Sequence, residues 1–291
     1  MKDLAEEYLL VCEADGYTVE TIRQKRVLLN QFIRYCNQND VEDVEEIASA
    51  FLRKWILDEK TRCKANSINS KIQHIRPFFN WLIEEEIIEK SPWAKIKLLK
   101  SPPPIIPAYD KEDIHKMLNY WKGNKFMPVR NKTMIICLAE TGVRNSEMRN
   151  IKLTDISNNA IRIMGKGNKI RYVPLSKVLK VQLNKYLRIR KEYMEGHESD
   201  LLFVSRYRRN VTRFALVKLI KEMGEVLDID VAKTIHNFRR FYIQNMIEKI
   251  DIYTLSKTVG HMKISTTQRY LESIADKRIL ERASKHSPLS T

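Results

Sequence analysis

Residues 97–107 read KLLKSPPPIIP, and this stretch divides the chain into two parts of different character. Its four prolines fall within six positions, from Pro102 to Pro107, where neither a helix nor a central strand can form. A run of this kind favours a stiff, extended connection, and domain boundaries fall in such segments. We therefore expect a first domain over residues 1–97, a linker over 98–107 and a second domain over 108–291.

The first domain has the sequence periodicity of a four-helix bundle. Apolar residues recur three and four positions apart in four runs. These runs are 4–11, 27–35, 51–56 and 72–83. Thr18 and Asp40 are the expected N-terminal caps of two of the helices. Trp81 and Trp93 could stack on nucleic acid bases, but their apolar surroundings favour a place in the core.

The second domain is predicted to be mostly helical, with one small antiparallel sheet. The segment TMIICLAE at 133–140 reads as a buried helix that ends at Gly142. Alternating apolar residues flank the segment GKGNK at 165–169, and this pattern predicts a β-hairpin from Ile161 to Leu175. The whole chain is therefore expected to be mainly α.

Positive charge is concentrated in the second part of the chain. The net charge is +16, with 16 Lys and Arg against 17 Asp and Glu over residues 1–107 and 36 against 19 over 108–291. This distribution indicates a polyanionic partner, which is usually nucleic acid. No apolar run is long enough to span a membrane, and the acidic N-terminus MKDLAEEYLL is unlike a secretory signal, so we expect a cytoplasmic protein.

The four cysteines are scattered and form no CxxC pair. No histidine cluster lies near any of them. This arrangement predicts neither a disulfide framework nor a zinc site. Four reduced thiols, most of them buried, are expected instead.

Three short segments of the second domain carry residues that could do chemistry, and each is ordinary when taken alone. TGVRNSEM places Arg144 at a helix junction with Glu147 three residues on, which by itself reads as a surface ion pair. GKGNK places Lys166 between two glycines, without the pattern of a Walker loop or a dinucleotide fingerprint. HNFR places His236 and Arg239 on one helix face, which suits either an anion site or a solvated basic surface.

A fourth segment, VGHMKISTTQRY, contains His261 and Tyr270 nine residues apart. Gly260 is expected to end one helix, and Ser265 with Gln268 has the form of a capping box that starts another. The tyrosine would then lie in the second turn of a short helix. Nothing in its immediate surroundings marks it as a nucleophile.

Taken in chain order, the four segments resemble the signature of the tyrosine recombinase (phage integrase) family, and the resemblance covers nearly the whole chain. The order is Arg, a turn Lys, His-x-x-Arg, Gly-His and Tyr. The resemblance implies that Tyr270 is the nucleophile and that Lys166 is the general acid, with Glu147 in a supporting role. The residues that it places around the scissile phosphate are Arg144, His236, Arg239 and His261.

The chain looks like the two-domain members of the family that resolve chromosome dimers or move mobile elements. Its first domain is similar to the family's core-binding (SAM-like) domain. The resemblance implies a site-specific DNA recombinase of the integrase or excisionase type, which works through a 3′-phosphotyrosine intermediate and a Holliday junction. No cofactor or metal is expected.

The partner that the resemblance implies is double-stranded DNA. It further implies a homotetramer on DNA and a monomer or weak oligomer in its absence, with the C-terminal tail docked on a neighbouring subunit. An accessory directionality factor would fit the same reading, and no membrane partner is expected.

Several basic residues are expected to contact the DNA backbone. The segment RYRRN and the helix that follows it are dense in positive charge with one aromatic residue, although a solvated face would have the same composition. Arg240 stands where many family members carry histidine. The predicted DNA contacts are Lys64, Arg206, Arg208, Arg209, Arg213, Lys218 and Arg240.

Three other readings remain open at this stage. A catalytically silent DNA-binding regulator would keep the same scaffold, but the complete set of motif residues argues against it. A topoisomerase would use the same chemistry without a preferred site. An RNA-binding helical protein would leave the ordered motifs unexplained.

Overall fold

The computed structural model describes residues 1–100, 108–230, 234–260 and 264–272, and at Lys166 and 269–272 it describes the backbone only. The chain divides into two compact units, Met1–Pro104 and Ile105–Thr291. The division falls inside the proline-rich segment. Each unit has a hydrophobic core of its own.

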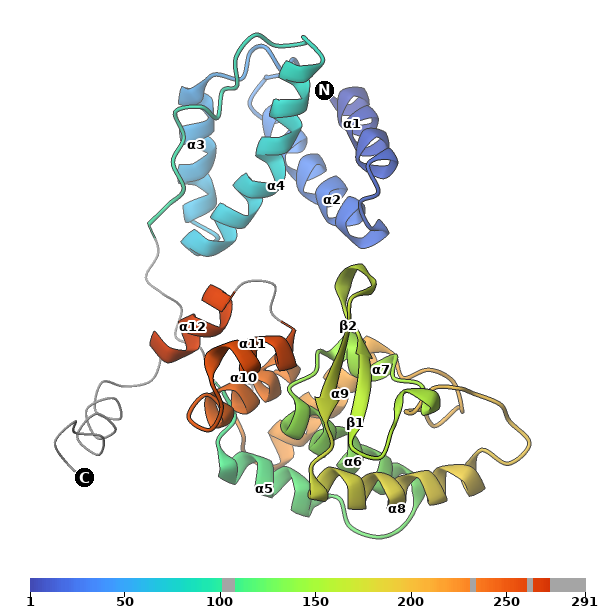
Figure 1. The fold of residues 1–291 in the computed structure, drawn as a ribbon. Helices are drawn as coiled ribbons and strands as arrows, with labels where there is room; N and C mark the ends of the chain where they lie inside the picture. Colours follow the sequence, from blue (N-terminus) through green and yellow to red (C-terminus); the bar gives the residue numbers. More distant parts are fainter. Residues whose placement is uncertain (101–107, 231–233, 261–263, 273–291) are drawn as a thin grey trace, which may run out of the picture. The chain divides into compact units, whose positions relative to one another are not determined.

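The described part of the first unit is a bundle of four helices (Figure 1). These are α1 (Lys2–Ala14), α2 (Val19–Asn37), α3 (Ser49–Lys60) and α4 (Ala65–Glu84). Their inward faces meet around aromatic side chains, and the rings of Trp55 and Trp93 pack edge to face with centroids 5.8 Å apart. Trp81 and Trp93 are 5% and 1% exposed. The prediction that both tryptophans belong to the core is confirmed.

One of the two predicted helix caps in this unit is correct. The Thr18 hydroxyl accepts a hydrogen bond from the backbone N–H of Thr21, so it caps the start of α2. The prediction for Asp40 is wrong, because α3 begins only at Ser49. Asp40 instead adopts a left-handed conformation (φ 57°) just after α2, where the N–H of Val41 donates to the carbonyl of Cys36.

The chain after α4 folds back onto the bundle. The side-chain amide of Asn69 donates to the carbonyl of Leu99 at 2.9 Å and accepts from its N–H at 2.8 Å. Arg76 donates to the carbonyl of Ile96 at 2.7 Å. The first unit therefore runs at least to Leu99, just beyond the start that we predicted for the linker.

In the second unit, helices surround one central helix, α6, which is buried along almost its whole length. α6 packs against α5, α8 and α10. The N-terminal half of α6 carries Arg130, Asn131 and Lys132, so the predicted apolar segment 133–140 captured only its C-terminal half. The helices described here are α5 (Lys111–Tyr120), α6 (Phe126–Thr141), α7 (Asn145–Arg149), α8 (Lys177–Tyr193), α9 (Arg213–Val226), α10 (Ile235–Met246), α11 (Ile252–Val259) and α12 (Ile264–Glu272), with short 3-10 turns η1 (Leu153–Asp155) and η2 (Lys166–Asn168).

The predicted hairpin is present and forms a two-stranded antiparallel sheet. Strands β1 (Ala160–Met164) and β2 (Ile170–Pro174) pair with Ile163 opposite Arg171. At the turn, Gly167 and Asn168 adopt left-handed conformations (φ 71° and 56°), which these two residue types tolerate best. The expected fold class, mainly α with a small antiparallel sheet, is confirmed.

Two glycines end the helices that lead into the predicted motifs. Gly142 follows α6 and Gly260 follows α11, both in left-handed conformations (φ 60° and 71°), as predicted. A Cβ atom on Gly142 would lie 2.7 Å from the ring of Tyr242, so α10 packs too closely for any larger residue. No helix within the described ranges is long and apolar enough to cross a membrane.

Candidate active site

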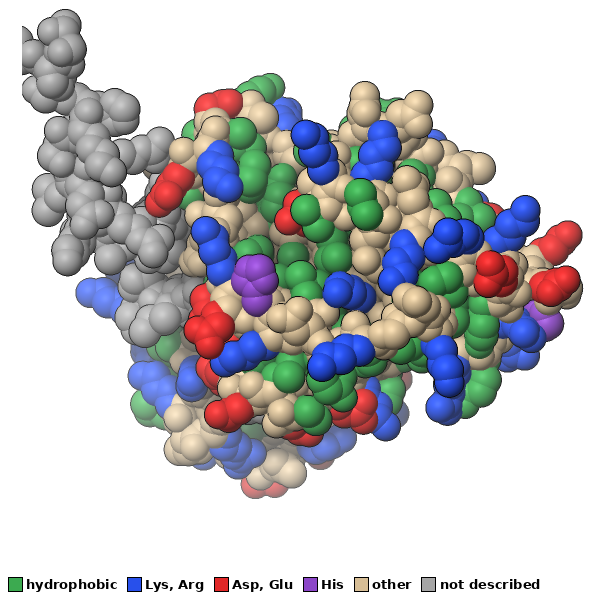
Figure 2. All heavy atoms as spheres, turned by 90° about the horizontal axis from the view of Figure 1, so that it is seen from below, with side chains coloured by type: hydrophobic (Ala, Val, Ile, Leu, Met, Phe, Trp, Pro, Cys, Tyr) green, Lys and Arg blue, Asp and Glu red, His purple; other side chains and the backbone are tan. Residues whose placement is uncertain are grey.

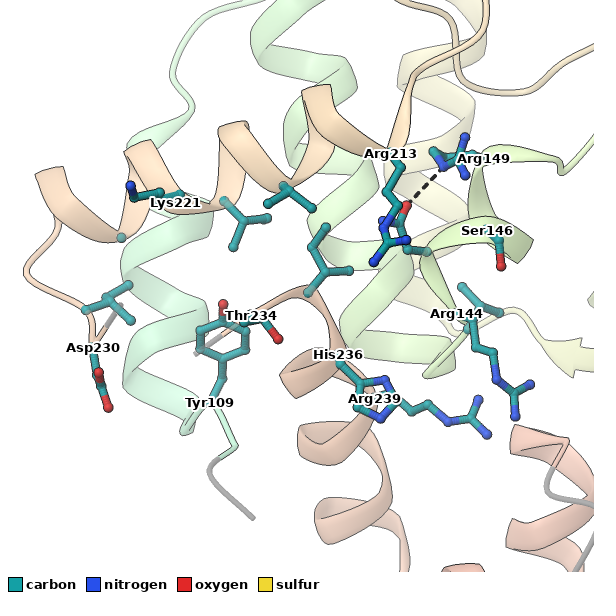
Figure 3. A pocket seen from close by; sticks show the side chains of 17 residues that line it. Tyr109, Arg144, Ser146, Arg149, Arg213, Lys221, Asp230, Thr234, His236 and Arg239 are labelled. Carbon is teal, nitrogen blue, oxygen red and sulfur yellow. Dashed lines mark hydrogen bonds between the residues drawn. The ribbon is translucent and has the colours of Figure 1, made fainter. Parts of the chain in front are cut away.

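A pocket of about 610 Å³ opens in the second unit beside α7, α9 and α10 (Figure 3). Arg144, His236 and Arg239 lie toward one end of it, whereas Tyr109 and Asp230 lie toward the other. The first three come from two motifs that are about ninety residues apart in the sequence. The fold therefore brings them around a single cavity.

Arg144 is held at the rim of the pocket by its backbone and by its side chain. Its N–H donates to one carboxylate oxygen of Glu147 at 2.7 Å, and its Nη1 donates to the other at 2.8 Å. Its Nη2 donates to the carbonyl of Gly260 at 3.2 Å. Glu147, to which the resemblance assigns a supporting role, thus contacts both the backbone and the side chain of Arg144 at the start of the short helix α7.

Glu147 is a buried carboxylate between two guanidinium groups, those of Arg144 and Arg171. Burial by itself would raise its pKa. The hydrogen bonds from Arg171 and from the Arg144 backbone, with the charge of Arg171, outweigh burial and lower the pKa to about 2. Glu147 is therefore ionised at neutral pH, and its charge is already neutralised by its two neighbours.

His236 and Arg239 lie one turn apart on α10 and point to the same side (Figure 3). Arg239 is 2% exposed and its Nη1 donates to the carbonyl of Gly142 at 2.9 Å. The pKa of His236 is lowered, first because the ring is partly desolvated at the protein surface and then by the charges of Arg240, Arg239 and Arg144. The imidazole is therefore neutral at pH 7 when the pocket holds no anion.

The cavity is a cationic one. Asp230 is the single acidic residue among the described residues that line it, and it lies at the end away from Arg144. Arg149 and Arg213 add two further guanidinium groups beside Arg144. Such a surface suits a bound phosphate. No cluster of His, Cys, Asp or Glu that could hold a metal occurs among the described residues.

The comparisons with known proteins agree with the motifs. Residues 108–277 match the Phage integrase family. The chain belongs to this family. It is similar to a tyrosine recombinase XerD of Halalkalibacterium halodurans, with 31% identity over 261 residues that cover 88% of this chain and 87% of the relative.

Two solved structures share the fold of this phage integrase family member. One is XerH site-specific recombinase bound to palindromic difH substrate, with a TM-score of 0.76 and 20% identity over 98% of this chain and 84% of that one. The other is the Tn1549 transposon integrase in complex with transposon right end DNA, with a TM-score of 0.78 and 14% identity over 98% of each chain.

Three of the family's motif residues lie wholly or partly outside what the structure describes. His261 falls outside the described residues, directly after Gly260, whose carbonyl contacts Arg144. Lys166 lies in the hairpin turn η2, and its side chain is outside the described part. The same holds for Tyr270, whose backbone is in α12. This helix starts at Ile264, so Ser265 lies inside it and the predicted capping box at Ser265 is wrong; the helix packs against α10 and α11.

The predicted DNA contacts around Tyr207 differ in how they are held. Arg206 and Arg209 are exposed, and the guanidinium of Arg206 lies over the Tyr207 ring, 4.6 Å from its centroid. Arg208 is half-buried and turned inward, where its Nε donates to the carbonyl of Tyr193 at 2.9 Å. The contacts of Arg208 are thus partly structural.

The remaining predicted DNA contacts lie in separate places. Arg213 begins α9 and lines the pocket, whereas Lys218 one turn later pairs with Glu222 at 3.5 Å. Arg240 is half-buried and its Nη1 lies 3.4 Å from the side-chain oxygen of Asn237. Lys64 is exposed at the start of α4 in the first unit.

Positive charge is spread over the surface of the molecule together with negative charge. Figure 2 shows one face of the molecule, on which Lys and Arg side chains are spread widely with Asp and Glu between them. Net charge alone therefore indicates a polyanionic partner for this family member without locating the site.

The sequence reasoning missed Arg149 and Arg171. Arg149 donates to Asn145 at 3.1 Å and to the carbonyl of Val211 at 3.2 Å, and its pKa is lowered by burial and by the charge of Arg213. Its position at the end of the same short helix as Glu147 was the available signal. Arg171 was overlooked because it occupies an ordinary hairpin strand.

Proposed function

We propose that this chain is a site-specific DNA recombinase that cuts and rejoins DNA strands with Tyr270 as the nucleophile. The observation that carries the proposal is the convergence of Arg144, His236 and Arg239 on one cationic pocket. The helix that carries Tyr270 packs against the helix of His236 and Arg239. The similarity to proteins named tyrosine recombinase XerD supports the same activity.

A phosphodiester resists attack because its own negative charge repels nucleophiles and its leaving group is poor. The pocket meets the first difficulty with guanidinium groups, which can bind two non-bridging oxygens at once where an ammonium cannot. Arg144 and Arg239 would take these oxygens. Because Glu147 and Gly142 already hold the two side chains, little reorganisation is needed as the transition state forms.

His236 would act as a hydrogen-bond donor to the same phosphate. Its lowered pKa leaves the ring neutral in the free enzyme, so it donates through one ring nitrogen without adding a full charge. An incoming phosphate would raise that pKa again by balancing the three arginines around it. His261, which follows Gly260, is proposed as a second donor on the same oxygens.

The covalent step exchanges one phosphate ester for another. The phenol oxygen of Tyr270 forms a bond to phosphorus while the bond to the 5′ oxygen breaks, which leaves a 3′-phosphotyrosine and a free 5′ hydroxyl. Lys166 would give its proton to the departing oxygen, and the phenol proton would pass to solvent water, a loss that the cationic pocket favours. The new ester retains the energy of the old one, so rejoining requires no ATP.

Double-stranded DNA is the proposed partner, and a homotetramer on DNA is the proposed assembly. Solved structures of the same fold include a lambda integrase tetramer bound to a Holliday junction. By analogy, a Holliday junction would be the intermediate between two rounds of strand exchange. An accessory factor that sets direction stays a proposal of the same kind.

The decisive experiment is covalent trapping on nicked DNA. A library of duplexes with random sequence, each nicked close to the cleavage position, loses a short strand after attack and leaves the protein attached. We expect an adduct that survives denaturation with the native chain and none with Tyr270→Phe. Absence of any adduct, with DNA binding intact, would instead establish a catalytically silent regulator.

The sequences recovered from the adduct separate the recombinase from the topoisomerase. Cleavage at one recurring sequence, followed by strand exchange between two copies of it, supports the recombinase. Cleavage spread over unrelated sequences, with relaxation of supercoiled plasmids, would support the topoisomerase.

A further inference from the structure

Arg171 belongs to none of the sequence motifs, yet its side chain donates hydrogen bonds to Glu147 and to the end of α11. It lies on β2, and its Nη1 and Nη2 donate to the two carboxylate oxygens of Glu147 at 2.9 and 2.7 Å. Its Nε donates to the carbonyl of Thr258, near the end of α11, at 2.9 Å. One side chain therefore joins the hairpin to α7 and to α11, and only 11% of it is exposed.

These bonds are part of a closed circuit. Glu147 accepts from Arg171 on one side and from Arg144 on the other. Arg144 in turn donates to Gly260, two residues beyond the Thr258 carbonyl that Arg171 holds. Both arginines therefore donate hydrogen bonds to the Glu147 carboxylate and to backbone carbonyls at the end of α11.

The backbone around Arg171 is shaped to fit this side chain. A Cβ atom on Gly260 would lie 3.0 Å from its Cδ and Nη1, and one on Gly165 would lie 3.6 Å from its Nη1 and 3.8 Å from Glu147. Gly165 precedes Lys166 in the hairpin turn, and Gly260 precedes His261. The guanidinium is therefore packed against two glycines, each directly before a predicted catalytic residue.

We propose that Arg171 is a positioning residue of the recombination reaction. Its guanidinium holds Arg144, the Lys166 hairpin and the turn before His261 in a fixed arrangement relative to one another. It is absent from the lining of the pocket, so it acts through these neighbours and not on the phosphate. This inference rests on the proposed function. Catalytic groups must be held within a fraction of an ångström, and a misplacement of about 1 Å can cost about 10²-fold in rate.

A lysine at this position would keep the positive charge but lose the fork. Its single ammonium cannot bind both oxygens of Glu147 and the Thr258 carbonyl in the same plane. Arg171→Lys therefore tests geometry with the charge unchanged. The matched control is Arg162→Lys on β1, because Arg162 also pairs with one carboxylate, that of Asp155 at 2.7 Å, whereas Arg171 pairs with Glu147, the carboxylate that holds Arg144.

The experiment measures single-turnover formation of the covalent adduct on a nicked duplex that carries the trapped sequence. We expect Arg171→Lys to lower the rate constant about 10²-fold, with DNA affinity and melting temperature close to those of the native chain. Arg162→Lys should leave the rate constant unchanged. A purely structural role of Arg171 would reduce the melting temperature and the active fraction but not the rate constant of the active molecules.

A double-mutant cycle with Glu147→Gln adds an independent test. If Arg171 acts through Glu147, the double variant should be about as slow as the slower single variant, because both break the same circuit. Full additivity of the two effects, or an unchanged rate for Arg171→Lys, would overturn the inference while leaving the proposed function intact. No adduct with the native chain would overturn both.

Discussion

Two groups of arginines in the second unit carry the same charge but are held in different ways. Arg144 and Arg239 are fixed by hydrogen bonds to Glu147, Gly260 and Gly142 at the pocket. Arg206 and Arg209, on either side of Tyr207, are exposed, so they could contact a phosphate chain from many side-chain conformations. Fixed cations can stabilise one transition state, whereas adaptable ones serve to hold a long polyanion.

The largest expected effect is predicted for Lys166. It tests whether a residue on a surface turn can take part in the chemistry, as the fixed arginines do, or only in holding DNA. Lys166 lies on a hairpin turn, as the loop arginines lie on a loop, yet we place it in the chemistry. Lys166→Ala should slow cleavage by about 10²–10⁴. A duplex with sulfur in place of the bridging 5′ oxygen should restore the rate, because a thiolate leaves without a proton.

The control for this prediction is Lys169→Ala in the same turn region, which should cleave both duplexes at the native rate. If the sulfur substrate fails to rescue Lys166→Ala, then Lys166 is not the proton donor. Single-turnover rates on the two duplexes decide the matter.

A somewhat smaller effect is expected for the buried guanidinium. Arg239→Lys should keep the hydrogen bond to Gly142 but lose the second hydrogen bond to the phosphate. The cleavage rate should fall by about 10²–10³ with little change in DNA affinity. Adduct formation at saturating protein and a filter-binding titration measure the two quantities separately. A loss confined to affinity would move Arg239 into the DNA-holding group.

For the exposed loop arginines we expect the opposite result, a loss of DNA affinity without a loss of cleavage rate. Arg206→Ala combined with Arg209→Ala is expected to weaken DNA binding and to lower the slope of log affinity against log salt by about 2, with the cleavage rate at saturation unchanged. Arg208→Ala is the contrasting variant, because its guanidinium contacts Tyr193 and should lower the melting temperature more than the salt slope. Binding titrations from low to high salt test both.

The smallest expected effect concerns the DNA-free protein and pH. The folded pKa of His236 lies below its ordinary value of 6.5, so the unfolded chain binds its proton more readily. The resulting stability is present above about pH 6.5 and is lost as the pH falls below it. Urea unfolding between pH 8 and 5 should show this decline, and His236→Gln should reduce it.

Glu147 does not interfere with that measurement. Its folded pKa of about 2 means that its contribution is present above its ordinary value of 4.5 and is lost only as the pH falls toward 2. A decline between pH 8 and 5 that is unchanged in His236→Gln would show that other groups cause it.

Much of the local structure was predictable because it depends on short-range physics. Gly142 and Gly260 end helices through left-handed conformations, and Gly167 with Asn168 turns the hairpin in the same way. Thr18 caps its helix with its own hydroxyl, whereas Asp40 shows the limit of this reasoning, since the same residue type can follow a helix as well as precede one.

The sequence by itself determined the family, the order of the motifs and the helices and hairpin that carry them. It could not show which face of β2 is buried: Ile170 and Tyr172 are 52% and 65% exposed, while the charged Arg171 points inward. Alternation along a strand decides which residues share a face. Only the packing of α7 and α11 beside the hairpin decides which face is covered, because Glu147 and the Thr258 carbonyl arrive there from other parts of the chain.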